Sequence, residues 1–272
     1  MRPGDVLFAS GLTLGFFALL GFASPPPQSN SGVSQLRQLG RGIQLYTADA
    51  DGTCPLAMIK EPNINRWQWN RSIEAPAGVR RDTPPEVAEA FRAAWVNSVL
   101  PYWPNKEILK IEGAPTAEPR LKLEDTVKEP WLVGFTYNGL LHSYASQAVA
   151  HPELVPLIWT GQGRANREGL VNAMPTLTCD LWLQANEPCK FGSGQQISQK
   201  SAMFMQMGPA KVFDGAIVLA MADGSVRRLI PDEETNMTSD DPWAMYDRRG
   251  YGMSYKQVDG YPPLFRPDRA PR

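Results

Sequence analysis

The stretch from residue 34 to residue 55, SQLRQLGRGIQLYTADADGTCP, constrains the fold of this chain most strongly. Its apolar residues recur at steps of three or four, the spacing of one stripe along an α-helix. These stripe residues are Leu36, Leu39, Ile43 and Tyr46. The intervening Gln and Arg side chains, Gln44 among them, are predicted to face outward. Asp51-Gly52 ends such a helix, and Pro55 cannot continue it.

A helix over residues 33–48 would be about 24 Å long. Burying its four stripe residues would contribute roughly 6–10 kcal/mol as an upper bound. A helix of this size cannot bury its own stripe, so the remainder of the chain must supply a cover. We therefore expect the second half of the chain to provide a β-sheet for this helix.

Four segments have the composition of strands. Three are the short apolar or aromatic runs 132–138, 156–160 and 202–207. Asn138-Gly139 follows the first run as a turn signal. The fourth segment, 215–229, reads as two strands joined at Asp223 and Gly224, because Asp-Gly supplies the positive φ angles of a tight hairpin turn. A second helix is predicted from Pro84 to Leu100, with Pro101 ending it.

The order of these segments resembles the type IV pilin-like proteins, and specifically the bacterial pseudopilin-like family with a C-terminal His-x9-Asp-Gly motif. The helix exit from Tyr46 to Pro55 resembles the family's Tyr-x-x-Asp-x-Asp-Gly-x-x-Pro segment. The later landmarks fall at 101–109, 132–161 and 213–229, in the family's order. The motif's His position is held by Phe213, so a role of that His is not carried over.

This resemblance implies an α+β, pilin-like fold in which an N-terminal helix packs on an antiparallel β-sheet, with a Pro-rich insertion at about residues 56–130. It also implies a non-catalytic structural or interaction role in the bacterial cell envelope, related to type II secretion or type IV pilus components. The expected partners are other pseudopilins or envelope proteins. The family's acidic residue after its Gly-Phe-Thr-Leu start is missing here, and prolines 25–27 would break a continuous helix, which argues against fibre assembly.

The N-terminus predicts export. Residues 6–23 carry no charge and end in small residues, which is typical of a cleaved signal peptide or a single short membrane anchor. Residues 1–32 are thus a leader with a Pro-rich linker, and residues 33–272 are the globular head. We expect a periplasmic or envelope-associated protein, held at the inner membrane by residues 6–23 if they stay uncleaved.

Three cysteines are present, and none forms a Cys-x-x-Cys pair. Cys179 and Cys189 close a short loop and are disulfide candidates in an oxidising compartment; two unpaired buried thiols are the alternative. Cys54 would then be left over or would compete as a partner.

The net charge and the acidic clusters limit the classes of ligand that the chain is expected to bind. A net charge of −1 without a long basic run argues against nucleic acid. Carboxylates after the hairpin are a weak calcium candidate, since Ca²⁺ prefers hard oxygen ligands; an acidic surface turn is the other interpretation. These residues are Asp232, Glu234, Asp240 and Asp241. We expect no other cofactor.

No catalytic motif is recognisable, so we name no catalytic residues and expect a protein that is not an enzyme. The competing enzyme hypothesis would use His142 or His151, or a pair of Cys54 with His142. The alternative function is an exported glycan- or protein-binding module that uses exposed tryptophans. Its candidates are Trp67, Trp69 and Trp103.

Overall fold

The computed structural model describes residues 28–117, 121–161, 165–177, 189–191, 201–204, 213, 216–229, 256–259 and 265–268. Three predictions lie outside these ranges: the leader at 6–23, the Cys179 half of the disulfide, and the acidic cluster at 232–241.

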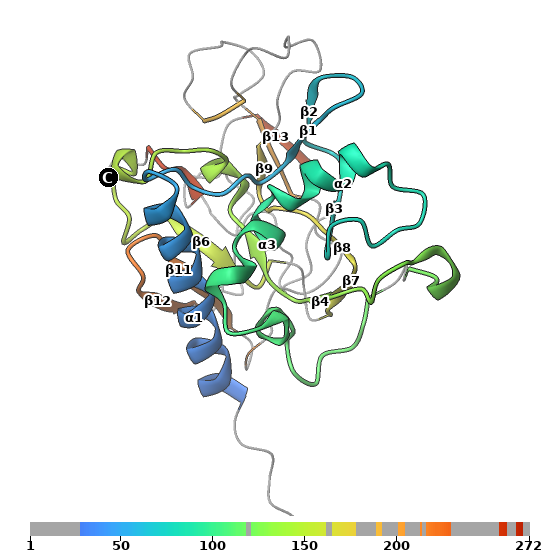
Figure 1. The fold of residues 1–272 in the computed structure, drawn as a ribbon. Helices are drawn as coiled ribbons and strands as arrows, with labels where there is room; N and C mark the ends of the chain where they lie inside the picture. Colours follow the sequence, from blue (N-terminus) through green and yellow to red (C-terminus); the bar gives the residue numbers. More distant parts are fainter. Residues whose placement is uncertain are drawn as a thin grey trace, which may run out of the picture.

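A long helix, α1 (Gln28–Asp49), lies along a four-stranded antiparallel sheet (Figure 1). Leu36, Leu39 and Ile43 are fully buried against this sheet, as the stripe predicted. The helix ends where predicted, because Asp51 and Gly52 both take positive φ angles, 51° and 77°. The α+β class with a helix on an antiparallel sheet is therefore confirmed.

The sheet under α1 has the order β12–β11–β6–β5. Its strands are β5 (Thr136–Tyr137), β6 (Pro156–Trp159), β11 (Ile217–Met221) and β12 (Val226–Leu229). Leu219 pairs with Trp159 on one side and with Arg227 on the other, which places the fully buried β11 at the centre. In the turn between β11 and β12, Gly224 has φ 90°, and Asp223 Oδ1 accepts from the Ser225 amide at 2.8 Å.

Smaller antiparallel sheets surround this one. They are formed by the pairs β1 (Ile59–Glu61) with β2 (Arg66–Gln68), β3 (Ile73–Glu74) with β8 (Leu170–Val171), and β4 (Leu132–Val133) with β7 (Arg167–Glu168). A three-stranded sheet joins β9 (Thr176–Leu177), β10 (Ser201–Phe204) and β13 (Lys256–Asp259). The short helices are α2 (Pro85–Arg92) and α3 (Trp95–Ser98), with 3₁₀ turns at Leu100–Tyr102, Lys106–Leu109, Leu123–Asp125, Gly139–Leu141 and Ser146–Ala148.

The single helix predicted from Pro84 to Leu100 is wrong. The chain breaks between α2 and α3, where Ala94 is extended and the Trp95 amide donates to the Leu56 carbonyl oxygen at 2.8 Å. Pro101 does not end a helix either, since it lies inside a 3₁₀ turn. The apolar side chains of this segment are buried even so; they are Val87, Phe91, Ala94, Trp95 and Val99.

The run 132–138 also divides between two sheets. Its first part forms β4 and its last part forms β5, and Asn138-Gly139 opens a 3₁₀ turn, in agreement with the predicted turn signal. The Asn138 side chain explains this, since its Oδ1 caps the Leu140 amide at 3.0 Å. Its Nδ2 donates to the carbonyl oxygens of Pro156 (2.8 Å) and Phe265 (2.9 Å).

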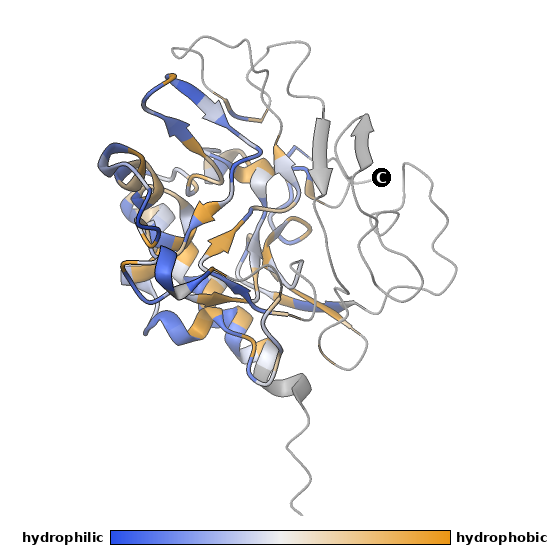
Figure 2. Ribbon diagram, turned by 90° about the vertical axis from the view of Figure 1, so that its right-hand side faces the viewer, coloured by the Kyte–Doolittle hydropathy of each residue, from blue (hydrophilic) through white to orange (hydrophobic). Residues whose placement is uncertain are grey.

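The core is continuous from α1 into the segment 56–130. Figure 2 shows apolar strands inside the molecule and hydrophilic segments around them. One buried cluster includes Leu39 of α1, Phe135 beside the sheet, and Phe91, Trp95 and Trp103 of the 56–130 segment. A second cluster lies around Trp159, whose ring centroid is 5.0 Å from that of Phe265. The Pro-rich segment thus shares its core with the helix and the sheet.

Candidate functional site

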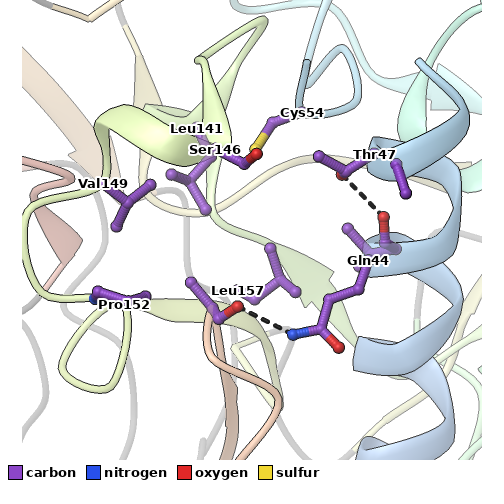
Figure 3. Close-up of a pocket in the computed structure, with 11 residues that line it drawn as sticks. Gln44, Thr47, Cys54, Leu141, Ser146, Val149, Pro152 and Leu157 are labelled. Carbon is purple, nitrogen blue, oxygen red and sulfur yellow. Dashed lines mark hydrogen bonds between the residues drawn. The ribbon is translucent and has the colours of Figure 1, made fainter. Parts of the chain in front are cut away.

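A pocket of about 270 Å³ opens beside the C-terminal half of α1 (Figure 3). Its walls come from α1, from the segment that follows the helix, from β6 with the connection that leads into it from β5, and from the hairpin turn after β11. The lining residues are Ile43, Gln44, Thr47, Ala48, Cys54, Leu141, Ser146, Val149, Pro152, Leu157 and Ala222.

Two hydrogen bonds position the α1 side of the pocket. Gln44 Nε2 donates to the Ala222 carbonyl oxygen at 2.9 Å, which ties the helix to the hairpin turn. Thr47 Oγ1 donates to the Ile43 carbonyl oxygen at 2.8 Å, within the helix. Gln44 is half-buried, so its predicted outward orientation is wrong. Its position beside Ile43 brings it to the edge of the buried stripe, and nothing in its local sequence marks the contact with residue 222.

Cys54 is a free, buried thiol on the pocket wall. Burial raises its pKa to about 11, while the neighbouring Tyr137 and Thr47 hydroxyls act in the opposite direction. Burial likewise raises the pKa of Tyr137 well above its usual range. At neutral pH, Cys54 is therefore protonated and is a weak nucleophile, because the thiolate is the reactive form.

His142, next to the lining residue Leu141 in the sequence, is fully buried. Its Nδ1 accepts from the Ala57 amide at 2.9 Å, which assigns the proton of the neutral ring to Nε2. Burial lowers its pKa to about 3. Nε2 has no hydrogen-bond partner among the described residues, and the ring makes an edge contact with Trp67, with 4.7 Å between centroids.

These environments do not favour the Cys54–His142 pair that a thiol enzyme would need. Both pKa shifts stabilise the neutral form, whereas an activated pair requires a thiolate and an imidazolium. The other histidine, His151, is partly exposed, with Nδ1 3.4 Å from Glu153 Oε1.

Of the tryptophans predicted to be exposed, one is buried and two are half-buried. Trp103 is 5% exposed and donates from Nε1 to the Leu39 carbonyl oxygen at 3.0 Å, so its predicted exposure is wrong. Trp67 and Trp69 are half-buried and pack against the second apolar cluster. The indole N–H of Trp103 has a backbone acceptor, as is usual for a tryptophan in a core.

The remaining predicted sites lie apart from the pocket floor. Asp223 and Gly224 form the hairpin turn, next to the rim residue Ala222. Cys189 is buried, with Sγ 3.7 Å from Sδ of Met58, and its predicted disulfide stays a prediction. The calcium candidates at 232–241 lie outside the described residues, within which no cluster of three His, Cys, Asp or Glu side chains occurs.

Phe213, separated from Asp223 by nine residues in the predicted motif, is buried against α1. A side chain at Gly32 would collide with its ring, so glycine at this position lets the ring approach the helix backbone. Phe213 thus makes an apolar contact with the backbone of α1.

Searches against protein-family models, curated proteins and solved structures found no match for this chain. None of the helices in the described ranges is both long and apolar enough to cross a membrane.

Proposed function

We propose that this protein is a non-catalytic, pseudopilin-like structural or interaction component of the bacterial cell envelope. The observation that carries the proposal is the packing of α1 on a sheet that contains the Asp223-Gly224 hairpin, with Gln44 bonded to the hairpin turn. The landmark order at 34–55, 132–161 and 213–229 and the uncharged segment 6–23 support it at the level of sequence.

The outward face of α1 is the surface that such a role leaves for a partner. Arg37 and Arg41 are exposed one turn apart, and neither forms an ion pair with a described residue. Leu45, in the next turn, is 47% exposed. An exposed cationic and apolar stripe on a helix that is buried on its other side suits docking against another envelope protein.

Site-specific photo-crosslinking in the native host tests this proposal. A photoreactive amino acid at Arg37, Arg41 or Leu45 should give discrete adducts with envelope proteins in intact cells. The matched control position is Arg66, which is exposed on the β1–β2 hairpin and should give few adducts. Fractionation should place the chain in the envelope.

A chain found in the cytoplasm would contradict the proposal. So would crosslinks as frequent at Arg66 as on α1. A mature N-terminus at Ser24 would rule out the membrane-held form and leave only a released periplasmic head.

A further inference from the structure

We infer that the pocket beside α1 binds a small, uncharged, mainly apolar molecule that carries a hydroxyl group. This inference goes beyond the envelope role and does not rest on it. The pocket has a buried floor that includes Ile43, Leu141 and Leu157, and an exposed rim that includes Ala48 and Ser146. A ligand can therefore enter from solvent and lose apolar surface to water at the floor.

The absence of charge in the lining selects the ligand class. None of the described side chains that line the pocket is ionisable near neutral pH, since Cys54 keeps its proton there. A charged ligand would lose hydration without gaining a counter-ion, which is costly in an apolar environment. An uncharged ligand loses little hydration, and its apolar body contacts Ile43, Leu141, Val149 and Leu157.

The polar atoms around the apolar walls account for the hydroxyl group. Thr47 donates its proton to the Ile43 carbonyl oxygen, so its oxygen acts as an acceptor, for which the neighbouring Cys54 thiol competes. Gln44 has committed its amide N–H to Ala222, which leaves its Oε1 as an acceptor. Ser146 on the rim can donate or accept. A ligand hydroxyl can donate to one acceptor and receive from Ser146.

The volume limits the ligand to a small molecule. A pocket of about 270 Å³ lies just below the usual range of ligand sites, roughly 300–1,000 Å³. This corresponds to about nine waters at ~30 Å³ each, the size of a one-ring phenol or a short alcohol. We use p-cresol as the probe, and p-toluate, which has the same ring and methyl group but a carboxylate, as the charged counterpart.

Cys54 supplies the readout because its thiol lies on the pocket wall. The full-length chain is treated with N-ethylmaleimide at fixed pH, and alkylation of the Cys54 peptide is followed by mass spectrometry. Saturating p-cresol should slow Cys54 alkylation at least about tenfold, the fraction of open pocket left at ten times the dissociation constant. The same concentration of p-toluate should leave the rate unchanged.

Two substitutions on α1 form a matched pair. Ala48→Phe places a ring at the exposed rim and should abolish the p-cresol effect, whereas Leu45→Phe adds a ring on the outward face and should preserve it. Both positions are exposed, so the fold should persist, which circular dichroism checks. Ser146→Phe blocks the mouth from the opposite wall if Ala48→Phe fails to fold.

Three results would overturn the inference. One is a Cys54 alkylation rate that does not change when p-cresol is raised to about 10 mM, a concentration above a dissociation constant of about 1 mM. Another is equal protection by p-toluate. The third is protection that persists in folded Ala48→Phe or Ser146→Phe, which would locate binding elsewhere.

Discussion

At the scale of single residues, burial decides which side chains carry charge. His142 and Cys54 are both buried, and burial holds each of them neutral. The sequence identifies them only as a histidine and a cysteine, which is equally compatible with a catalytic pair. Their burial could not be predicted because it depends on residues far along the chain: the Ala57 amide for His142, and the Tyr137 side chain for Cys54.

His142 should make folding stability sensitive to acid. Its pKa is about 3 when folded and near 6.5 when unfolded, so between these values the unfolded chain binds the extra proton. Stability is therefore unaffected by this group above about pH 6.5 and falls by up to about 1.4 kcal/mol per pH unit below it. Urea unfolding measured from pH 7.5 to pH 4 gives the slope.

His142→Asn tests the assignment, since the Asn oxygen can still accept from the Ala57 amide but does not titrate. This variant should be less stable than the native chain at pH 7.5, by about 1–3 kcal/mol, and should show a shallower acid slope. The control is Asn63→Ala in an exposed loop, which removes no ionisable group and should retain the native slope. An unchanged slope in His142→Asn would show that other groups cause the acid sensitivity.

At the scale of elements, α1 is the part that the sequence predicted best. Its apolar spacing and its Asp-Gly exit are local signals, which set its buried stripe and its end. The helix begins at Gln28, five residues before the predicted start at residue 33. The break between α2 and α3 and the division of 132–138 depend on bonds to Leu56, Pro156 and Phe265, which periodicity cannot reveal. The pocket was missed for the same reason: its walls come from four separate segments.

At Gly42 the backbone of α1 lies close to the side chain of Trp103, a contact that the apolar stripe does not predict. A Cβ at this position would collide with the Trp103 indole, which is buried and donates to Leu39. In an exposed helix, Gly→Ala would stabilise by about 1 kcal/mol. Here, displacement of the ring should reverse the sign, and Gly42→Ala should destabilise the protein by about 1–2 kcal/mol net.

Chemical denaturation of Gly42→Ala beside Gln38→Ala provides the comparison. Gln38 is exposed on the same helix, and its substitution should change stability by less than about 0.5 kcal/mol. In a Trp103→Phe background, Gly42→Ala should cost less than in the native chain, because the smaller ring leaves room. A stabilising Gly42→Ala would mean that α1 and the Trp103 segment are not in close contact.

At the scale of the whole molecule, the segment 56–130 belongs to the same cooperative structure as the helix and the sheet. Asn166 is fully buried and holds this segment from the second half of the chain. Its Oδ1 accepts from the Ile111 amide at 2.8 Å, and its Nδ2 donates to the Ile111 and Ala114 carbonyl oxygens at 3.0 and 3.3 Å. Its backbone bonds to Pro115 and Ala117.

Asn166→Ala should therefore lower the stability of the entire fold. The loss of buried partners for Ile111 and Ala114 should cost about 2–4 kcal/mol, whereas Asn63→Ala in an exposed loop should cost less than about 0.5 kcal/mol. Tryptophan fluorescence and far-ultraviolet circular dichroism should report one coincident transition. Two transitions, with only one shifted, would show that the segment unfolds independently.

The hydrogen bonds of the Asn138 side chain affect how far the C-terminus can be shortened by proteolysis. The Asn138 side-chain amide donates to the carbonyl oxygens of both Pro156 and Phe265, and the Phe265 ring packs against the indole of Trp159. Proteolytic removal of Phe265 would thus uncover the Trp159 indole and leave the Asn138 Nδ2 donor without one of its two acceptors. A chain shortened past residue 265 should therefore lose its resistance to further carboxypeptidase digestion, because the contacts of Phe265 also cover the core.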